Sequence, residues 1–446
     1  MIFMTHDLTK GPVMPAMLRF AVPMIFGNLL QQCYNIADTM IVGHFLGANA
    51  LAAVGSSFTL MTFLTSILLG LCMGSGNVFS IRFGEHNEKG LKESVCASFV
   101  LIAAAALFLN IAAFVCLEHI SSLMQVPAEV WSMMRTYLKV IFCGITAVFM
   151  YNYFAAFLRA IGNSLIPLVF LGISAILNIL LDLIFVLCLS LGVSGAALAT
   201  VISQYISGIG IAVYALRNCT DLRIFNKQFK VTKARLKEIA NFSFLTCLQQ
   251  SVMNLGILMV QGLVNSFGTN VMAAFAAAVK IDAFAYMPVQ DFGNAFSTFI
   301  SQNYGAGEKK RIRKGLKGAV ITSITFSIIV SIAVWFFARP LMELFIGTKE
   351  PAIVTEGIRY LRIEGAFYCG IGCLFLLYGL YRALGKPGMS VILTFLSLGT
   401  RVILAYMLSA IPDIGVTGIW WSVPIGWFLA DMFGIIYYKL RKNHLL

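Results

Sequence analysis

Charged side chains are scarce in this sequence. They make up 11% of its 446 residues, while hydrophobic residues make up 59%. A soluble globular chain is about one quarter charged and close to half apolar. The sequence also lacks a GxxxxGK(S/T) phosphate loop, an HExxH zinc motif and a GxSxG nucleophile motif. Enzyme chemistry therefore has no support, and we predict a protein that is not an enzyme and has no catalytic residues.

Metal-binding and disulfide patterns are missing as well. The ten cysteines form no CxxC pair and no Cys/His cluster, and most of them lie inside apolar runs. We therefore expect no disulfide framework, no structural metal site and no cofactor.

Long hydrophobic runs are what the sequence has instead. A helix needs about 20 apolar residues to cross a bilayer. Twelve runs meet this requirement and predict an all-α integral membrane protein with twelve transmembrane helices. The predicted spans are 14–43, 51–80, 93–117, 130–158, 164–189, 194–216, 236–266, 270–303, 317–339, 353–384, 388–410 and 415–438.

The formal net charge of +13 has two explanations, nucleic-acid binding and basic cytoplasmic loops. The side that holds the N-terminus and the even-numbered loops carries 24 of the 32 Lys and Arg residues, against 6 on the opposite side. By the positive-inside rule both termini are cytoplasmic. We therefore expect a multi-pass protein of the plasma (inner) membrane that binds no nucleic acid.

The two halves of the sequence resemble each other. One constant offset superposes GANALAA at Gly47 on GTNVMAA at Gly268, and a nearly equal offset carries Tyr137 onto Tyr360. Six spans repeated in one orientation predict two pseudo-symmetric six-helix lobes, a parallel repeat. The predicted parts are an N-terminal lobe over 1–216, a basic cytoplasmic linker over 217–235 and a C-terminal lobe over 236–446.

One face of the first span is polar. Gln31, Tyr34, Asn35 and Asp38 follow the i, i+3, i+4, i+7 spacing of a single helix face. Because a polar stripe on a lipid-embedded helix faces the protein interior, these side chains are predicted to line a polar cavity of the N-terminal lobe. Pro23 removes a backbone hydrogen bond earlier in the same span and predicts a kink.

Polar groups of the fifth and sixth spans lie at a similar depth. Asn178 and Asp182 share one face of span five, and Thr200 lies in span six. Asp38, Asp182 and Thr200 are each roughly 9–12 Å below the outer end of their span. Two carboxylates, an amide and a hydroxyl suit a small hard cation such as Na⁺. Two neighbouring carboxylates equally suit a shared proton, and a purely structural hydrogen-bond network is the third interpretation.

The C-terminal lobe carries a different set of charges. Lys280, Asp282, Glu364 and Arg401 lie inside its predicted spans, and the offset that carries Tyr137 onto Tyr360 places Arg401 opposite Asn178. Because Lys280 and Glu364 lie at a similar depth, we predict a buried pair of a base and an acid, with a polar substrate site as the alternative.

The stretch PMIFGNLLQQCYNIADTMIVGHFLGANALAAVG, from Pro23 to Gly55, resembles the start of multidrug and toxic compound extrusion (MATE) transporters. The resemblance covers essentially the whole chain: twelve spans, two six-helix lobes and a cytoplasmic link. Its most specific part is the first span with the LGxxALAAVG pattern that follows. Within the family the sequence is most similar to the DinF-like branch.

This resemblance implies a coupling site in the N-terminal lobe. Members of the DinF-like branch use an aspartate of span one with Asn, Asp and Thr of spans five and six as a cation site. The family's span-one proline, implicated in bending, matches Pro23, and polar positions of span four match Tyr137 and Asn152. The positions that match the cation site are Asp38, Asn178, Asp182 and Thr200.

The other large bacterial branch of the family relies on acids in the C-terminal lobe, including a glutamate of span seven. This sequence has Gln249, Gln250 and Asn254 in the middle of that span. The departure argues against a cation site confined to the C-terminal lobe, while Asp282 and Glu364 leave a second site there as an alternative.

We predict a secondary active antiporter that exports organic, often cationic or amphipathic, compounds in exchange for H⁺ or Na⁺ by alternating access. Its partners are small organic substrates and the lipid bilayer, and nothing in the sequence requires more than a monomer. The alternative is a flippase for a lipid-linked or other amphipathic metabolite. That function favours a more basic central cavity than Lys280 and Arg401 provide.

Overall fold

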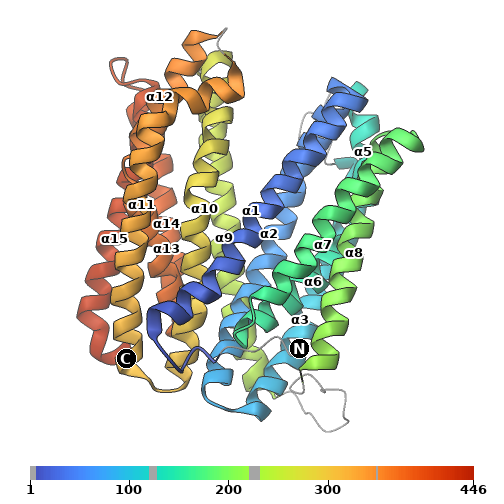
Figure 1. Ribbon diagram of the computed structural model, residues 1–446. Helices are drawn as coiled ribbons and strands as arrows, with labels where there is room; N and C mark the ends of the chain where they lie inside the picture. The colour runs from blue at the N-terminus through green and yellow to red at the C-terminus, as the bar shows by residue number, and fades with distance from the viewer. Residues whose placement is uncertain (1–6, 120–127, 220–231, 348–349, 446) are drawn as a thin grey trace. The chain divides into compact units, whose positions relative to one another are not determined.

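Helices make up the described part of the chain. The computed structural model describes residues 7–119, 128–219, 232–347 and 350–445, and no strand occurs within these ranges. In a bilayer, backbone N–H and C=O groups find partners only inside a helix or a closed barrel, which explains helices throughout so apolar a chain. In chain order they are α1 (Val13–Leu46), α2 (Ala48–Gly84), α3 (Glu88–Val115), α5 (Ala128–Phe142), α6 (Ile145–Ala160), α7 (Leu165–Asp182), the π-helical η1 (Leu183–Cys188), α8 (Gly192–Asn218), α9 (Lys233–Asn265), α10 (Thr269–Gly305), α11 (Lys309–Ile346), α12 (Pro351–Gly365), α13 (Tyr368–Ala383), α14 (Pro387–Ser409) and α15 (Val416–Leu445) (Figure 1).

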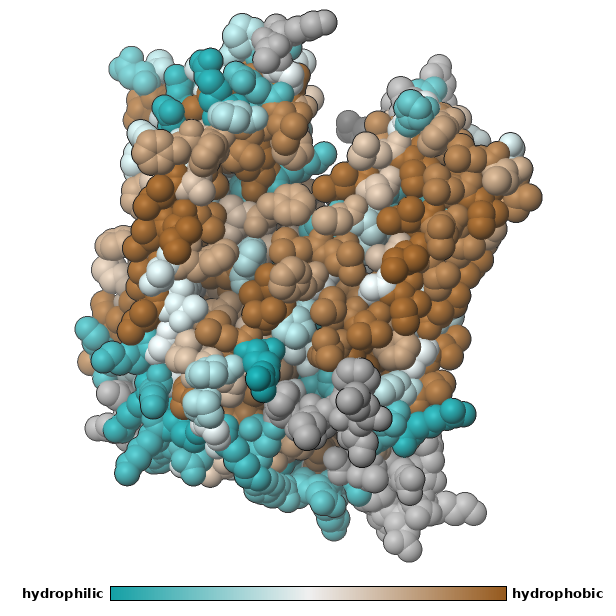
Figure 2. All heavy atoms as spheres, in the orientation of Figure 1, coloured by the Kyte–Doolittle hydropathy of each residue, from teal (hydrophilic) through white to brown (hydrophobic). Residues whose placement is uncertain are grey.

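Most of these helices are long and apolar enough to cross a membrane. Among the described residues, ten helices meet that requirement alone. Two pairs meet it together, α5 with α6 and α12 with α13, and they bend by 45° and 51° at short breaks. Counting each bent pair as one span gives twelve, which confirms the predicted all-α membrane fold. Figure 2 shows hydrophobic side chains along the middle of the helices and hydrophilic side chains gathered near their ends.

The internal repeat predicted from the sequence is visible in the helices. Helices α2 and α10 are both 37 residues long, and they begin directly after the matching glycines Gly47 and Gly268. The φ angles of these glycines are 83° and 95°, a region that glycine adopts without strain. The breaks between α5 and α6 and between α12 and α13 are related by the offset that carries Tyr137 onto Tyr360. Positions at these offsets are therefore structural counterparts.

The chain divides into two compact units. Unit 1 contains residues 1–7 and 26–247, and unit 2 contains residues 8–25 and 248–446. These units differ from the predicted lobes in two segments, because the first part of α1 groups with unit 2 and the first part of α9 groups with unit 1. Most of the linker predicted over 217–235 lies outside the described residues, which leave out 220–231.

The start of the described chain is held in unit 2 by Arg311 of α11. Its guanidinium donates hydrogen bonds to the backbone carbonyls of Gly11 and Leu8, at 2.7 Å and 3.0 Å. A guanidinium carries five N–H donors in a fixed fork, which suits several converging carbonyls. Met17 and Phe20 of α1 continue this contact into a buried hydrophobic cluster of the same unit.

The start of α9 is held in unit 1 by an ion-pair network and a hydrogen bond. Glu238 of α9 pairs with Arg82 of α2 and, at 2.9 Å, with Arg235. The hydroxyls of Ser75 and Ser243 form a hydrogen bond of 2.8 Å between the same two helices. Arg235 lies on α9 itself, so the pair between Glu238 and Arg82 is the one that joins α9 to α2, and a pair of Arg235 with Glu93 at 3.7 Å joins it to α3.

Glycines of α2 let α9 approach closely within unit 1. A Cβ atom at Gly70 would lie 2.5 Å from the Cα of Cys247, and a Cβ atom at Gly74 would lie 2.5 Å from the carbonyl oxygen of Phe242. Small residues four apart are common between transmembrane helices, because they let two backbones meet. The contact between α2 and α9 therefore depends on the absence of a side chain at these two positions.

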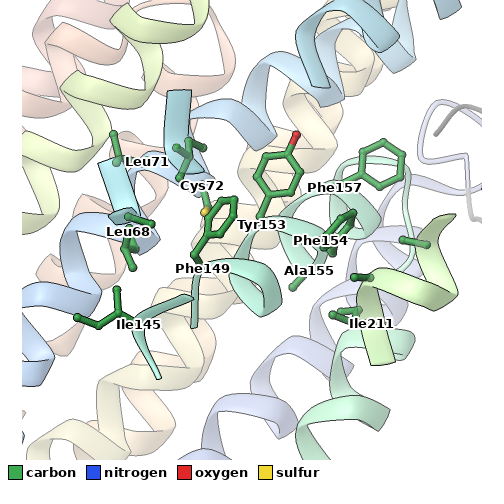
Figure 3. Close-up of a cluster of buried hydrophobic side chains, with 14 of the residues drawn as sticks. Leu68, Leu71, Cys72, Ile145, Phe149, Tyr153, Phe154, Ala155, Phe157 and Ile211 are labelled. Carbon is green, nitrogen blue, oxygen red and sulfur yellow. The ribbon is translucent and has the colours of Figure 1, made fainter. Parts of the chain in front are cut away.

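The hydrophobic core of unit 1 lies between α2, α3, α6 and α8 (Figure 3). The Tyr153 ring is buried in it, and its hydroxyl donates to the backbone carbonyl of Val95 at 2.7 Å, so its polar end is satisfied. The side chains labelled in Figure 3 are Leu68, Leu71, Cys72, Ile145, Phe149, Tyr153, Phe154, Ala155, Phe157 and Ile211. This core fixes the helices against which the polar groups of unit 1 are placed.

We predict that Gly74→Leu destabilises the protein by about 1–3 kcal/mol or more, because the new side chain meets the backbone of α9. The measurement is the thermal unfolding midpoint of the purified protein in detergent, followed by tryptophan fluorescence. Gly55→Leu on the same helix is the matched control, since a Cβ atom at Gly55 has nothing within 4 Å. Equal midpoints for the two variants would contradict the close contact described here.

Candidate functional site

The two acids predicted for the coupling site lie side by side in unit 1. Asp38 of α1 and Asp182 of α7 are within hydrogen-bonding reach of each other, and their charges interact directly. Asp182 is fully buried, and no described group donates a hydrogen bond to either of its carboxylate oxygens or to Oδ1 of Asp38. Three of the four carboxylate oxygens of this pair therefore have no donor among the described residues.

Two ionised carboxylates at this separation repel each other strongly in an apolar environment. A proton held between them removes one charge, and a small cation bound between them offsets both. The stability of this arrangement therefore depends on an ion that the chain itself does not supply.

Asp182 is the last residue of α7, where the chain passes into the π-helical η1. Such segments are rare and are frequent at functional sites. Asn178, one turn earlier on the same face, donates from Nδ2 to Oγ1 of Thr200 on α8 at 3.3 Å. Its Oδ1 has no hydrogen-bond partner within the described chain. The structure thus places Asp182, Asn178 and Thr200 near one another beside Asp38.

The donor set decides which ion this site suits. The described residues contain no group of three or more His, Cys, Asp and Glu side chains that fits a metal ion. Two carboxylates, one amide oxygen and one hydroxyl form a small set of hard oxygen ligands, which suits Na⁺ or a proton rather than a transition metal.

Tyrosines surround the acid pair. Both carboxylates act electrostatically on the buried Tyr137 of α5, as does Tyr34 of α1. Tyr34 in turn forms a side-chain hydrogen bond with Gln31. Tyr34 and Gln31 of the predicted polar stripe therefore lie near the acids, and Tyr137 of the fourth span lies near them on another helix.

Two other residues predicted for this cavity have no described bond to the acids. Asn152 of α6 is half-buried, and its Nδ2 donates to the backbone carbonyl of Val148 in its own helix at 2.9 Å. Asn35 is half-buried on α1. The sequence analysis missed Tyr151, which donates to the carbonyl of Pro167 at 3.0 Å and so ties α6 to α7. No periodicity distinguished Tyr151 from its aromatic neighbours.

Unit 2 contains a second cluster of buried acids. Tyr368 of α13 donates to Oδ1 of Asp282 on α10 at 2.6 Å, and Tyr360 of α12 donates to Oε2 of Glu364 at 2.9 Å. All four side chains are at most 5% exposed. Tyr360 is the counterpart of Tyr137, so both units place a tyrosine beside their acids. The repeat was the sequence signal for Tyr360, whereas Tyr368 had none.

The base of this second cluster is Arg401 of α14. The prediction that Lys280 pairs with Glu364 is therefore wrong. The guanidinium of Arg401 interacts electrostatically with both Asp282 and Glu364. Lys280 is exposed on α10, whereas Asp282 is buried on the same helix. Residues two apart on a helix point about 200° apart, so Lys280 cannot share the inward face of Asp282.

Comparison with known proteins gives a consistent result. The MatE family model matches residues 23–184 and 243–407. The chain is 29% identical to a probable multidrug resistance protein, YpnP, of Bacillus subtilis, over 98% of this chain and 97% of that protein. It is 26% identical to the multidrug export protein MepA of Staphylococcus aureus, over 98% and 96% of the two chains. The solved structure of a MOP superfamily transporter from Pyrococcus furiosus superposes with a TM-score of 0.93 at 24% identity, covering 98% of each chain, and shares the two-lobe fold.

We predict that Tyr368→Phe destabilises the protein by about 1–3 kcal/mol, because it leaves a buried oxygen of Asp282 without its donor. The thermal unfolding midpoint in detergent measures the effect. Tyr406→Phe is the control, because Tyr406 on α14 is 49% exposed. A Tyr368→Phe midpoint no lower than that of Tyr406→Phe would show that the hydrogen bond contributes nothing.

Proposed function

Because this chain belongs to the MATE family of membrane transporters, we propose that it is a secondary active antiporter. It exports organic, often cationic or amphipathic, compounds in exchange for H⁺ or Na⁺. As a multi-span transporter rather than an enzyme, it acts by exposing its binding sites alternately to the two sides of the membrane.

The names of the relatives support the substrate class. YpnP of Bacillus subtilis is named as a probable multidrug resistance protein and MepA of Staphylococcus aureus as a multidrug export protein. Both align with nearly the whole of this chain. Small organic molecules are therefore the proposed cargo.

The observation that carries the coupling proposal is the facing pair of Asp38 and Asp182 without a donor. In the proposed cycle, H⁺ or Na⁺ from outside neutralises or occupies this pair, with Asn178 and Thr200 as further oxygen ligands. The occupied site favours the state that releases substrate outward. An ion shifts such an equilibrium only by its different affinity for the two states.

The remaining parts of the proposal follow from the sequence. The resemblance to the DinF-like branch supports an N-terminal coupling site, and Pro23 in α1 is the proposed point of bending during the cycle. The asymmetric distribution of Lys and Arg supports cytoplasmic termini in the plasma membrane. The working unit in this proposal is a monomer.

We predict that Asp38→Asn lowers gradient-driven export by about tenfold or more, because a site that no longer distinguishes the two states shifts nothing. The assay is transport of a fluorescent organic cation in everted membrane vesicles with an imposed H⁺ or Na⁺ gradient. The gradient that drives transport by the unchanged chain identifies the coupling ion.

Asp413→Asn is the matched control, since Asp413 is exposed outside the helices. Normal gradient-driven export by a well-expressed, folded Asp38→Asn variant would contradict the coupling role. No transport by the unchanged chain under either gradient would favour the flippase alternative, which an assay with lipid-linked cargo then tests.

A further inference from the structure

A tyrosine beside each acid cluster lies at a counterpart position of the repeat, although the acids themselves do not correspond. Tyr137 and Tyr360 correspond to each other in the two halves, and each is buried beside two acids. Each also lies on the helix that precedes the bend of its span, α5 before the 45° bend and α12 before the 51° bend. The two clusters therefore share the position of this tyrosine in the repeat, while each unit takes its acids from other positions.

The residue types at these counterpart positions differ in charge. At the offset that carries Tyr137 onto Tyr360, Asn178 of α7 corresponds to Arg401 of α14, and Asp182 corresponds to Ala405. Helix α7 packs on α8, and α14 packs on α15. Unit 2 thus carries a guanidinium at the position where unit 1 carries an amide that serves as an oxygen ligand in the proposed site.

The charges within each cluster follow from this difference. In unit 1 the groups that act on Asp38 and Asp182 are the two acids themselves, with no base among them. In unit 2 Arg401 acts on both Asp282 and Glu364, and Tyr286, Tyr360 and Tyr368 are the titratable neighbours. A guanidinium stays protonated under all ordinary conditions. One cluster therefore lacks a cation, and the other contains a permanent one.

Two atoms of the unit 2 cluster have no hydrogen-bond partner within the described residues. They are Nε of Arg401 and Oε1 of Glu364, and both are buried. A buried donor and a buried acceptor in one cluster show a guanidinium held near the acids by charge rather than bound to them in a fixed fork. One guanidinium charge offsets one of the two acid charges, as a single proton held between the acids does in unit 1.

We propose that Arg401 is a tethered cation that takes the place of an exchangeable ion in unit 2, so that the protein binds its coupling ion only in unit 1. This proposal rests on the proposed antiport function for the meaning of the unit 1 site. In this proposal, Arg401 determines how many ions the protein exchanges in each transport cycle. It also predicts that the unit 2 acids become an ion site once the guanidinium is removed.

The test counts the cation equivalents that the purified full-length protein binds. Bound ²²Na⁺ is measured by equilibrium dialysis, and proton uptake is measured in weakly buffered detergent solution when the pH is lowered from alkaline to mildly acidic. We expect Arg401→Asn, which places the residue type of Asn178 at its counterpart, to bind about one equivalent more than the unchanged chain. Adding Glu364→Gln to Arg401→Asn removes the extra equivalent.

Two control variants separate charge from shape. Arg401→Lys keeps the positive charge and is expected to leave the count unchanged, as is Arg339→Asn, whose side chain is 70% exposed near the end of α11. Arg401→Gln provides a second neutral variant should Arg401→Asn fail to fold. An unchanged count in the folded neutral variant, or a gain in Arg401→Lys equal to that in Arg401→Asn, would overturn the proposal.

The outcome is distinguishable from failure of the proposed function. Transport that persists in Asp38→Asn contradicts coupling at unit 1, whatever the count in the Arg401 variants. A gain of one equivalent in Arg401→Asn that Glu364→Gln removes supports the role of Arg401, whatever the transport result.

Discussion

The main constraint on this structure is that a charged side chain inside a membrane-embedded helix bundle needs a partner. Lipid provides no donor for a carboxylate, so each buried acid has to find a proton, a base or an ion within the protein. In unit 1 Asp38 and Asp182 find only each other. The tyrosine beside them, and the hydrogen bond from Asn178 to Thr200, organise the oxygen atoms around the pair without neutralising it. The positions of these few side chains therefore create a negatively charged site that a proton or a small cation neutralises.

Close contacts elsewhere in each unit hold its helices in position. The glycines of α2 bring α9 against its backbone, and Arg82 with Glu238 fixes the same contact near its end. In unit 2 Arg311 holds the start of the described chain by its backbone carbonyls. Helix α1 passes from unit 2 to unit 1 shortly after Pro23 and carries Asp38 further along. A change of charge at Asp38 thus acts on a helix that is anchored at its other end in the other unit.

Local periodicity was enough to predict much of this arrangement. Apolar runs predicted the spans, and four-residue spacing placed Asn178 and Asp182 on one face, which depth then matched to Asp38. The prediction for Lys280 was wrong because it compared only depth in the membrane and ignored rotation about the helix axis. Lys280 and Asp282 are two residues apart, so they lie on opposite faces of the helix. The sequence did not predict that the first part of α1 groups with unit 2 and the first part of α9 with unit 1. This grouping depends on close tertiary contacts such as those at Gly70 and Gly74.

The repeat explains why a tyrosine lies beside each acid cluster, and the departures from it explain why the acids themselves lie at other positions in the two units. Repetition of six spans keeps the scaffold, so the bends, the glycines before α2 and α10 and the tyrosines recur at nearly constant offsets. A single exchange of an amide for a guanidinium, between positions 178 and 401, changes what such a scaffold needs from its surroundings. A fixed positive charge satisfies acids permanently, whereas an ion that comes and goes couples their state to its concentration. Within one repeated framework, the placement of one arginine thus distinguishes the acid cluster that contains its own cation from the cluster that does not.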